Sequence, residues 1–452
     1  MAAITAAGAA HGANIVYGTQ AVGGVNPTAQ HVTVNTTWTS DNVYYLTDPV
    51  FVKDGATLTI QPGTVIRGTK TDANIAGDFP GALVVSRGSK IFAVGTATQP
   101  IIMTGADDNN VPGMTATSPW NNSENGLTQQ WGGLIVLGRA FLATNVGGSG
   151  TPSPNAALDL QIEGLEPFGD YSRYGGGNDD DSSGEIKFLQ IRYGGFVLGE
   201  ANEINGLTLG AVGRGTKISF VEITNNKDDG VEFFGSTVNT KYMIVRNSAD
   251  DSFDWDEGYR GKGQFWFVVQ GSLHTTSDSS DKGSECDGGM GDTSQPSSCP
   301  TIYNATYVGL GKDIANNGKN TALNFRDGTA GRVYNSMFVD FGGAFAIIEG
   351  ATTGAGTSAE KTQKDYVQNQ YYTHEANGSK MLELKGNCFA LFGTPTIPEW
   401  PANSSNLGGP YGTDGTDGNK PGYGYAWQQD NVYQTTSPFY YERSQTVLGG
   451  GC

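Results

Sequence analysis

Thr216–Gly235 reads TKISFVEITNNKDDGVEFFG, and Val238–Glu257 reads VNTKYMIVRNSADDSFDWDE. The two stretches repeat one pattern, which places Asp228 and Asp250 at equivalent positions 22 residues apart. In each copy a strand of Val, Ile, Phe or Tyr is followed by an Asn/Asp turn and a second short strand. Such a unit cannot bury its own apolar face, so it must stack on another copy of itself. The repeat therefore predicts one coil of an all-β solenoid, a parallel β-helix, in each copy.

Outward from this repeat, short β-branched strands alternate with tight corners. PVFV (49–52), ATLTI (56–60) and TVI (64–66) are separated by Asp-Gly and Pro-Gly turns. This pattern is typical of a coil with short straight sides. Two polar stretches, 105–130 and 143–183, interrupt it and are expected to be loop insertions on the solenoid.

The sequence predicts three regions. A small, polar N-terminal arm is expected over 1–36, and the β-helix over 37–350. Residues 351–452 are rich in Gly, Pro, Tyr and Asn toward their end. We expect them to form an irregular C-terminal cap or assembly region, because the end of a solenoid exposes unpaired strand edges.

The charge of the chain restricts its partners. Asp and Glu number 45 against 27 Lys and Arg, which gives a formal net charge of −18. This charge opposes binding to nucleic acid or anionic membranes, and it suits divalent cations or a solvated exterior. No stretch approaches the roughly 20 apolar residues that a membrane-spanning helix needs, so no membrane insertion is expected.

The four cysteines bear on the compartment. Their spacing matches no zinc site, and the two local pairs, Cys286–Cys299 and Cys388–Cys452, are the expected disulfides of three possible connectivities. Disulfides imply an oxidising compartment, although reduced thiols are the alternative. The first basic residue is Lys53, so a basic leader region is missing. We therefore expect the numbering to be that of a mature, secreted or cell-surface chain.

Three further stretches carry a resemblance to a known family: DGATLTIQPGTVIRG (54–68), DDGVEFFGSTVNTKYMIV (228–245) and DDSFDWDEGYRGKGQF (250–265). In these stretches the chain resembles a family of secreted or cell-surface bacterial right-handed parallel β-helix proteins. The likeness covers roughly residues 40–345. It implies a right-handed, single-stranded parallel β-helix and export from the cell. It brings no established activity and hence no active site.

Strand alternation predicts an acidic column on the outside of the coils. Val231, Phe233, Phe253 and Trp255 are expected to fill the interior, so the residues between them face outward on neighbouring coils. GSECD (283–287) is expected to be the next coil, and Asn324 and Arg326 are expected to end the column. The candidate metal ligands in and beside this column are Asp228, Asp229, Glu232, Asp250, Asp251, Asp254, Asp256, Glu285 and Asp287.

Stacked carboxylates repel each other, so a cation, protons or Arg326 must compensate them. Three explanations stay open. The first is bound Ca²⁺, a hard cation that takes six to eight oxygen ligands. The second is a solvated acidic ridge whose turn Asp residues bind their own backbone. The third is polysaccharide cleavage, with Asp254, Asp256 and Glu285 as acid and base, and Arg260, Lys262 or Arg326 near the substrate.

These observations favour a structural function. We expect a non-catalytic, exported protein of the cell surface or extracellular matrix that is stabilised by calcium and associates with itself into a filament or layer. The alternative is a Ca²⁺-dependent polysaccharide-binding protein, or a polysaccharide lyase or glycoside hydrolase, that uses the acidic column between residues 232 and 287. Polysaccharide is thus a possible second partner.

Overall fold

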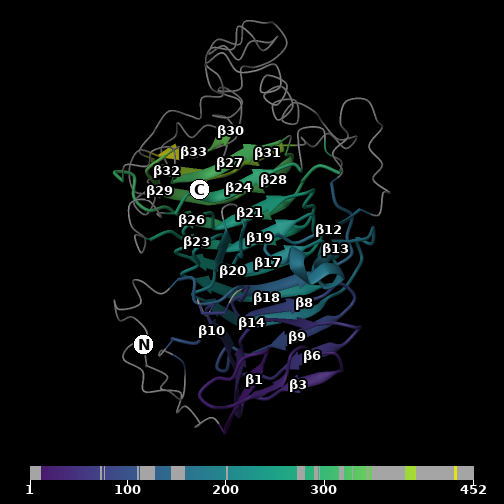
Figure 1. Cartoon of the computed structure of the whole chain (residues 1–452). Helices are drawn as coiled ribbons and strands as arrows, with labels where there is room; N and C mark the ends of the chain where they lie inside the picture. Colours follow the sequence, from purple (N-terminus) through teal and green to yellow (C-terminus); the bar gives the residue numbers. More distant parts are fainter. Residues whose placement is uncertain are drawn as a thin grey trace, which may run out of the picture.

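The structure is a computed structural model. It describes residues 12–71, 74–75, 77–108, 111, 128–143, 158–199, 202–271, 280–289, 294, 296–314, 320–327, 329–343, 346–348, 382–392 and 432–434. The described chain winds into a tall stack of coils, with the first strands at one end and the last strands at the other (Figure 1). None of its described helices is both long and apolar enough to cross a membrane.

One face of the stack is a nine-stranded sheet in which each coil contributes one short strand. All its pairings are parallel, as the sequence repeat predicts. Its strands, in spatial order, are β5 (Pro49–Val52), β8 (Ala82–Val85), β11 (Gly133–Leu137), β17 (Leu207–Gly210), β19 (Val231–Phe234), β21 (Phe253–Asp256), β24 (Lys282–Asp287), β27 (Thr321–Arg326) and β30 (Ile347–Ile348).

The other two faces belong to a 20-stranded sheet, which is also parallel throughout. Its first row is β3 (Thr36–Trp38), β6 (Thr57–Ile60), β9 (Lys90–Val94), β22 (Lys262–Gln264), β25 (Thr301–Tyr303), β28 (Gly331–Tyr334) and β31 (Leu382–Lys385). Its second row is β1 (Ala13–Tyr17), β2 (Pro27–Ala29), β4 (Asn42–Leu46), β7 (Val65–Gly68), β10 (Ile101–Gly105), β23 (Phe267–Val269), β26 (Thr306–Val308), β29 (Met337–Phe341), β32 (Cys388–Phe392) and β33 (Val432–Gln434). Three longer strands run through both rows: β14 (Gly184–Arg192), β18 (Lys217–Thr224) and β20 (Asn239–Arg246).

The core fills the interior of the coils, and it follows the predicted alternation. Phe233 of β19 is the parallel partner of Trp255 of β21, and both side chains are buried. Phe253 stacks on Trp266, which lies between β22 and β23, with ring centroids 4.1 Å apart. Successive coils are therefore held together by continuous apolar columns. The right-handed parallel β-helix expected from the sequence is confirmed.

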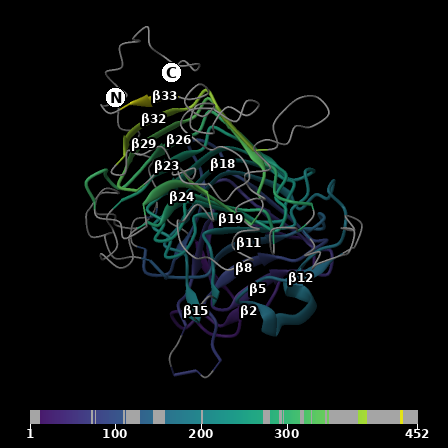
Figure 2. The same cartoon turned by 90° about the horizontal axis from the view of Figure 1, so that it is seen from above.

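An inserted segment covers the outer face of the nine-stranded sheet near its early strands. It comprises the antiparallel pair β12 (Asp159–Gln161) and β13 (Arg173–Gly175), joined by a 3₁₀ segment, Glu166–Ser172. Figure 2 places β12 outside the line of β5, β8 and β11. Apolar side chains of this segment pack on outward-facing residues of those strands, among them Leu137 of β11. Part of the insertion predicted over 143–183 is thus a folded segment that covers the outer face of the nine-stranded sheet.

The coils begin earlier and continue later than the sequence suggested. We expected residues 1–36 to form an arm, but Ala13–Tyr17 is β1 and pairs residue by residue with β4. The cause is apolar burial, because Val16 and Tyr17 of this strand enter the core. Past residue 350, β31 and β32 add a further layer to β28 and β29. Most of the predicted C-terminal cap, 351–452, lies outside the described residues.

The predicted Cys286–Cys299 disulfide is wrong. Cys286 is a free thiol, and its side chain is fully buried in the core between the coils. Strand alternation in β24 turns it inward beside Trp255 of the neighbouring coil, its parallel partner. The Cys299 thiol instead accepts a hydrogen bond from Arg332 at 3.8 Å. The other expected bridge, Cys388–Cys452, cannot be placed because Cys452 lies outside the described residues.

Candidate functional site

The structure assembles the acidic column in the predicted order. Glu232 of β19 is the parallel partner of Asp254 of β21, and Asp254 is the partner of Glu285 of β24. Glu285 in turn faces Asn324 of β27, where the column ends. These side chains alternate with the core residues Phe233, Trp255 and Cys286 and lie on the outside of the sheet, as expected.

The column is not a solvated ridge. Glu232 and Glu285 are each only 9% exposed, and Asp287 is 5% exposed. Asp254 and Asp256 are half-buried. The second of the three explanations, a solvated acidic ridge, therefore does not describe Glu232, Glu285 and Asp287. Because burial removes water from charged carboxylates, each needs a cation, a proton or a hydrogen-bond donor in its place.

Two basic residues neutralise the later half of the column. The Lys282 ammonium lies 2.8 Å from Glu285 and 3.7 Å from Asp251, and it also pairs with Asp281 at 3.1 Å. Arg326 reaches Glu285 at 2.7 Å and holds Asp287 through two hydrogen bonds of 2.9 and 2.5 Å. The carboxylates of this half are therefore paired with protein cations.

The earlier half of the column has no such compensation. We call Asp229, Glu232 and Asp254 the carboxylate triad, because one oxygen of each lies within 4.8 Å of the others. The salt bridges formed by described residues reach none of the three. Asp229 accepts a hydrogen bond of 2.8 Å from the Asp251 amide, and Glu232 accepts one from the Asn205 side chain. Oδ1 of Asp254 is buried without any hydrogen-bond partner.

The electrostatics of the triad follow from this geometry. Burial, followed by the negative charge of neighbouring carboxylates, raises the pKa of Asp229, Glu232 and Asp254 well above the ordinary range. Near neutral pH the triad must therefore hold protons or a cation. Asp287 differs, since the nearby Arg326 partly offsets its burial and its pKa is raised to about 7.

The turn carboxylates form a second layer beside the column. Asp228 and Asp250 bring an oxygen within 4.8 Å of Asp229, and Asp250 and Asp251 do the same with Asp281. Burial raises the pKa of Asp251 well above its usual value, although Lys282 opposes the shift. The structure thus brings Asp228 and Asp250 to Asp229, the triad member that both groups share, as the calcium hypothesis requires.

The groups present fit a hard divalent cation. Ca²⁺ takes its ligands from carboxylate, amide and carbonyl oxygens. The triad supplies carboxylate oxygens from three positions, and the unpartnered Oδ1 of Asp254 is the kind of buried atom that a cation would satisfy. Glu285 and Asp287 are already held by Lys282 and Arg326, so they fit the role less well. Asp256 accepts a hydrogen bond of 2.5 Å from the Glu257 amide.

Sequence reasoning missed three residues of this site: Asn205, Asp281 and Lys282. Asn205 and Lys282 occupy the position that Asp229 and Asp251 hold in their coils, at or just before the start of the sheet strand. Aligning NGLTL (205–209) with DGVEF (229–233) would have found Asn205. Arg260, one of three basic residues considered under the polysaccharide-cleavage explanation, pairs with Asp179 at 2.8 Å.

A separate buried acid lies beside the column. Glu257 accepts a hydrogen bond of 2.8 Å from the Tyr174 hydroxyl of β13. Burial, together with the charge of Asp256, raises the pKa of Glu257 to about 8. This contact ties the covering segment to the end of β21, and the sequence gave no sign of it.

Comparison with known proteins supports the same architecture. A family model described as a pectate-lyase-like beta helix domain matches residues 30–390. No curated protein matches the chain. No solved structure matches it either. The matched range includes all of the acidic column and nearly all of the coils described above.

Proposed function

The chain belongs to the pectate-lyase-like beta helix domain family, and from that premise we propose that it is a non-catalytic, calcium-stabilised protein of the cell surface or extracellular matrix. The family is consistent with a carbohydrate-related or surface protein. The choice between a structural and an enzymatic use of the fold depends on the acidic column.

The observation that carries the proposal is the state of the carboxylate triad. A hydrolase or lyase that used the column would need its carboxylates open to a sugar chain. Glu232 and Glu285, which flank Asp254 in the column, are buried, and Lys282 and Arg326 already occupy the later half. Largely dehydrated carboxylates that have no basic partner among the described residues suit a cation bound for stability.

Calcium at this position would stabilise the stack directly. Glu232 belongs to β19 and Asp229 precedes it, whereas Asp254 belongs to β21, so one ion would join two successive coils. Bound calcium would also displace the protons that the triad carboxyls otherwise hold because they are buried. Because the unfolded chain cannot present these carboxylates together, the binding free energy would add to folding stability.

Export and self-association are parts of the same proposal. A net charge of −18 keeps copies apart in solution, and divalent cations would reduce that repulsion. At the early end of the stack, the outer edge of β3 is unpaired among the described residues, whereas its other edge bonds to β6. Such a parallel edge is a natural place for another chain to add.

Two assays test the proposal together. Unfolding temperature is measured after chelation and again with added Ca²⁺ or Mg²⁺, and the same samples are incubated with polygalacturonate, xylan and other glycans. The proposal predicts a rise in unfolding temperature that is larger with Ca²⁺, and no release of sugar fragments. Glycan cleavage that Asp254→Asn abolishes would instead favour an enzyme.

A further inference from the structure

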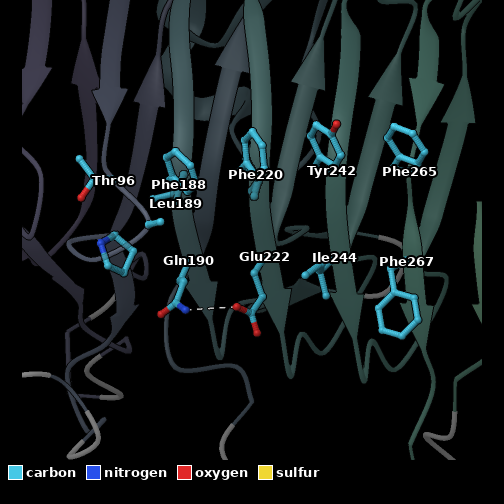
Figure 3. Close-up of a pocket in the computed structure, with 13 residues that line it drawn as sticks. Thr96, Phe188, Leu189, Gln190, Phe220, Glu222, Tyr242, Ile244, Phe265 and Phe267 are labelled. Carbon is cyan, nitrogen blue, oxygen red and sulfur yellow. Dashed lines mark hydrogen bonds between the residues drawn. The ribbon is translucent and has the colours of Figure 1, made fainter. Parts of the chain in front are cut away.

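A row of aromatic side chains runs along the outside of the 20-stranded sheet (Figure 3). The acidic column lies on a different face, that of the nine-stranded sheet. Each of four coils contributes one ring. The ring centroids of Phe188 and Phe220 are 4.6 Å apart, those of Phe220 and Tyr242 4.5 Å, and those of Tyr242 and Phe265 5.0 Å. The rings are nearly parallel, with interplanar angles of 13–19°. We call these four residues the aromatic row.

The backbone beneath the aromatic row is strained. All four residues lie at the bend between the two halves of the sheet, and all have φ between +50° and +57°. Bulky aromatic residues rarely adopt this left-handed conformation, whereas Asn and Gly adopt it readily. Later coils place Asn304 and Asn335 at the same bend. Because Asn would fit this backbone conformation better, we infer that the aromatic rings serve a function other than stabilising the fold.

A groove lies beside the aromatic row. Its second wall is formed by outward side chains two residues further along each strand: Gln190, Glu222, Ile244 and Phe267. The hollow between the two walls has a volume of about 460 Å³, and Thr96, Ala97 and Pro100 line one end of it. This volume is in the range of small-ligand sites. Phe220, Tyr242, Ile244, Phe265 and Phe267 are each 37–40% exposed, so the groove is open to solvent.

We propose that this groove binds a neutral, extended oligosaccharide chain that lies along the axis of the solenoid. The inference goes beyond the structural function proposed above, because it assigns a ligand to a face that the acidic column does not touch. Four aromatic rings span three coil spacings, about 14 Å at the usual distance between strands. A short oligosaccharide has this length.

The chemistry of the walls suits a sugar chain better than a hydrocarbon chain. Because the rings stack on one another, they present their edges outward, and these edges carry the positive part of the ring quadrupole. Hydroxyl and ring oxygens are attracted to such edges. On the opposite wall Gln190 donates a hydrogen bond of 3.1 Å to Glu222, and this polar pair lies between apolar positions. An amphipathic ligand can contact both kinds of wall, whereas an acyl chain would cover the charged Glu222 carboxylate without replacing the water that this group loses.

Charge and shape select further among ligands. The lining of the groove contains one charged residue, Glu222, and the Arg192 guanidinium donates a hydrogen bond of 2.6 Å to the neighbouring Gln190. Because this nearby cation offsets the carboxylate, and because the protein as a whole is strongly negative, the groove favours a neutral ligand. A second copy of the chain would bring a broad, flat surface, and this would leave the hollow between the walls unfilled.

The test uses substitutions to Asn, the residue that occurs at the same bend in later coils. Phe220→Asn and Tyr242→Asn install the residue that later coils carry at the same bend, so the double variant should keep the coil geometry. Tyr303→Ser is the matched control, because Tyr303 is a 40% exposed ring of the same sheet that does not line the groove. Sedimentation with insoluble cellulose, chitin and xylan measures retention, and polygalacturonate serves as the anionic comparison.

We expect the full chain and Tyr303→Ser to be retained on at least one neutral polysaccharide. Each ring removed from the aromatic row, at Phe220 or Tyr242, should lower the affinity about tenfold, which corresponds to about 1.4 kcal/mol. Retention that the double variant leaves unchanged would overturn the proposal, as would retention on polygalacturonate alone or no retention at all. If the only effect of the double variant is the loss of a dimer, the groove would instead be the interface with a second copy of the chain. The unfolding temperature with Ca²⁺, measured on the same samples, reports separately on the function proposed above.

Discussion

Glu232 and Asp254 face each other across one parallel strand pair on the outside of the β-helix, and no described basic residue forms a salt bridge with either. Their carboxylates, with that of Asp229, are held within 4.8 Å of one another. The arrangement places like charges together in a partly dehydrated position. It is stable only if something positive is added.

Replacing Asp254 by Asn should change how stability responds to calcium. In chelator the variant should be more stable than the wild type at neutral pH, by about 1 kcal/mol, because a buried and uncompensated carboxyl has been removed. Added Ca²⁺ should no longer raise its unfolding temperature. Circular dichroism during heating measures both effects. Asp107→Asn, at an exposed carboxylate that pairs with Lys70, should keep the wild-type response.

The metal-free protein should lose stability as the pH rises. The pKa values of the triad are raised in the folded state, so above the unfolded value of about 4 the folded chain binds more protons than the unfolded chain. The free energy of unfolding then falls with increasing pH, until the folded groups also lose their protons. Glu257, with a pKa of about 8, extends this window to mildly alkaline pH.

Denaturant unfolding in chelator between pH 5 and pH 9 measures this dependence. Calcium should flatten the curve and release protons as it binds, which calorimetry in buffers of different ionisation enthalpy detects. Stability that increases over this range in chelator would show that the triad is not buried in the way described here.

Arg326 should be important for stability in the later half of the column. Arg326→Leu leaves Glu285 and Asp287 without one of their cations and should cost about 2–3 kcal/mol in unfolding free energy. Adding Asp287→Asn should recover part of that loss, because the unpaired buried charge is then removed. Urea unfolding of both single variants and the double variant measures the coupling, and a loss in the double variant equal to the sum of the two single losses would mean that the pair contributes none.

Cys286 should behave as an inaccessible thiol. Its side chain is fully buried, and burial raises its pKa well above the usual value, so little thiolate forms. A thiol reagent should therefore label Cys286 in the folded protein far more slowly than in urea, as mass spectrometry of the modified peptides would show. Rapid labelling under native conditions would contradict the placement of this residue in the core.

The order of the acidic column could be predicted from the sequence because it depends on local rules. Side chains alternate along a strand, and the spacing between Asp228 and Asp250 sets the register of one coil on the next. These rules placed Glu232 opposite Asp254 and ended the column at Asn324 and Arg326. Both placements are confirmed.

Burial and charge compensation could not be predicted in this way, because they depend on residues distant in the sequence. Lys282 pairs with Asp251, 31 residues earlier in the chain, because β24 stacks directly on β21. Leu142 packs against Gly235 beside the column, although the two belong to separate parts of the chain. The positive φ of Tyr242 could not be predicted either, because aromatic residues rarely adopt this conformation.

A crystal structure determined from calcium-soaked protein, with anomalous scattering to locate the ion, tests the central claim most directly. We predict a peak that contacts carboxylate oxygens of Asp229, Glu232 and Asp254. Fully ordered density for the triad with no ion at saturating calcium, or calcium bound only elsewhere on the coils, would contradict it.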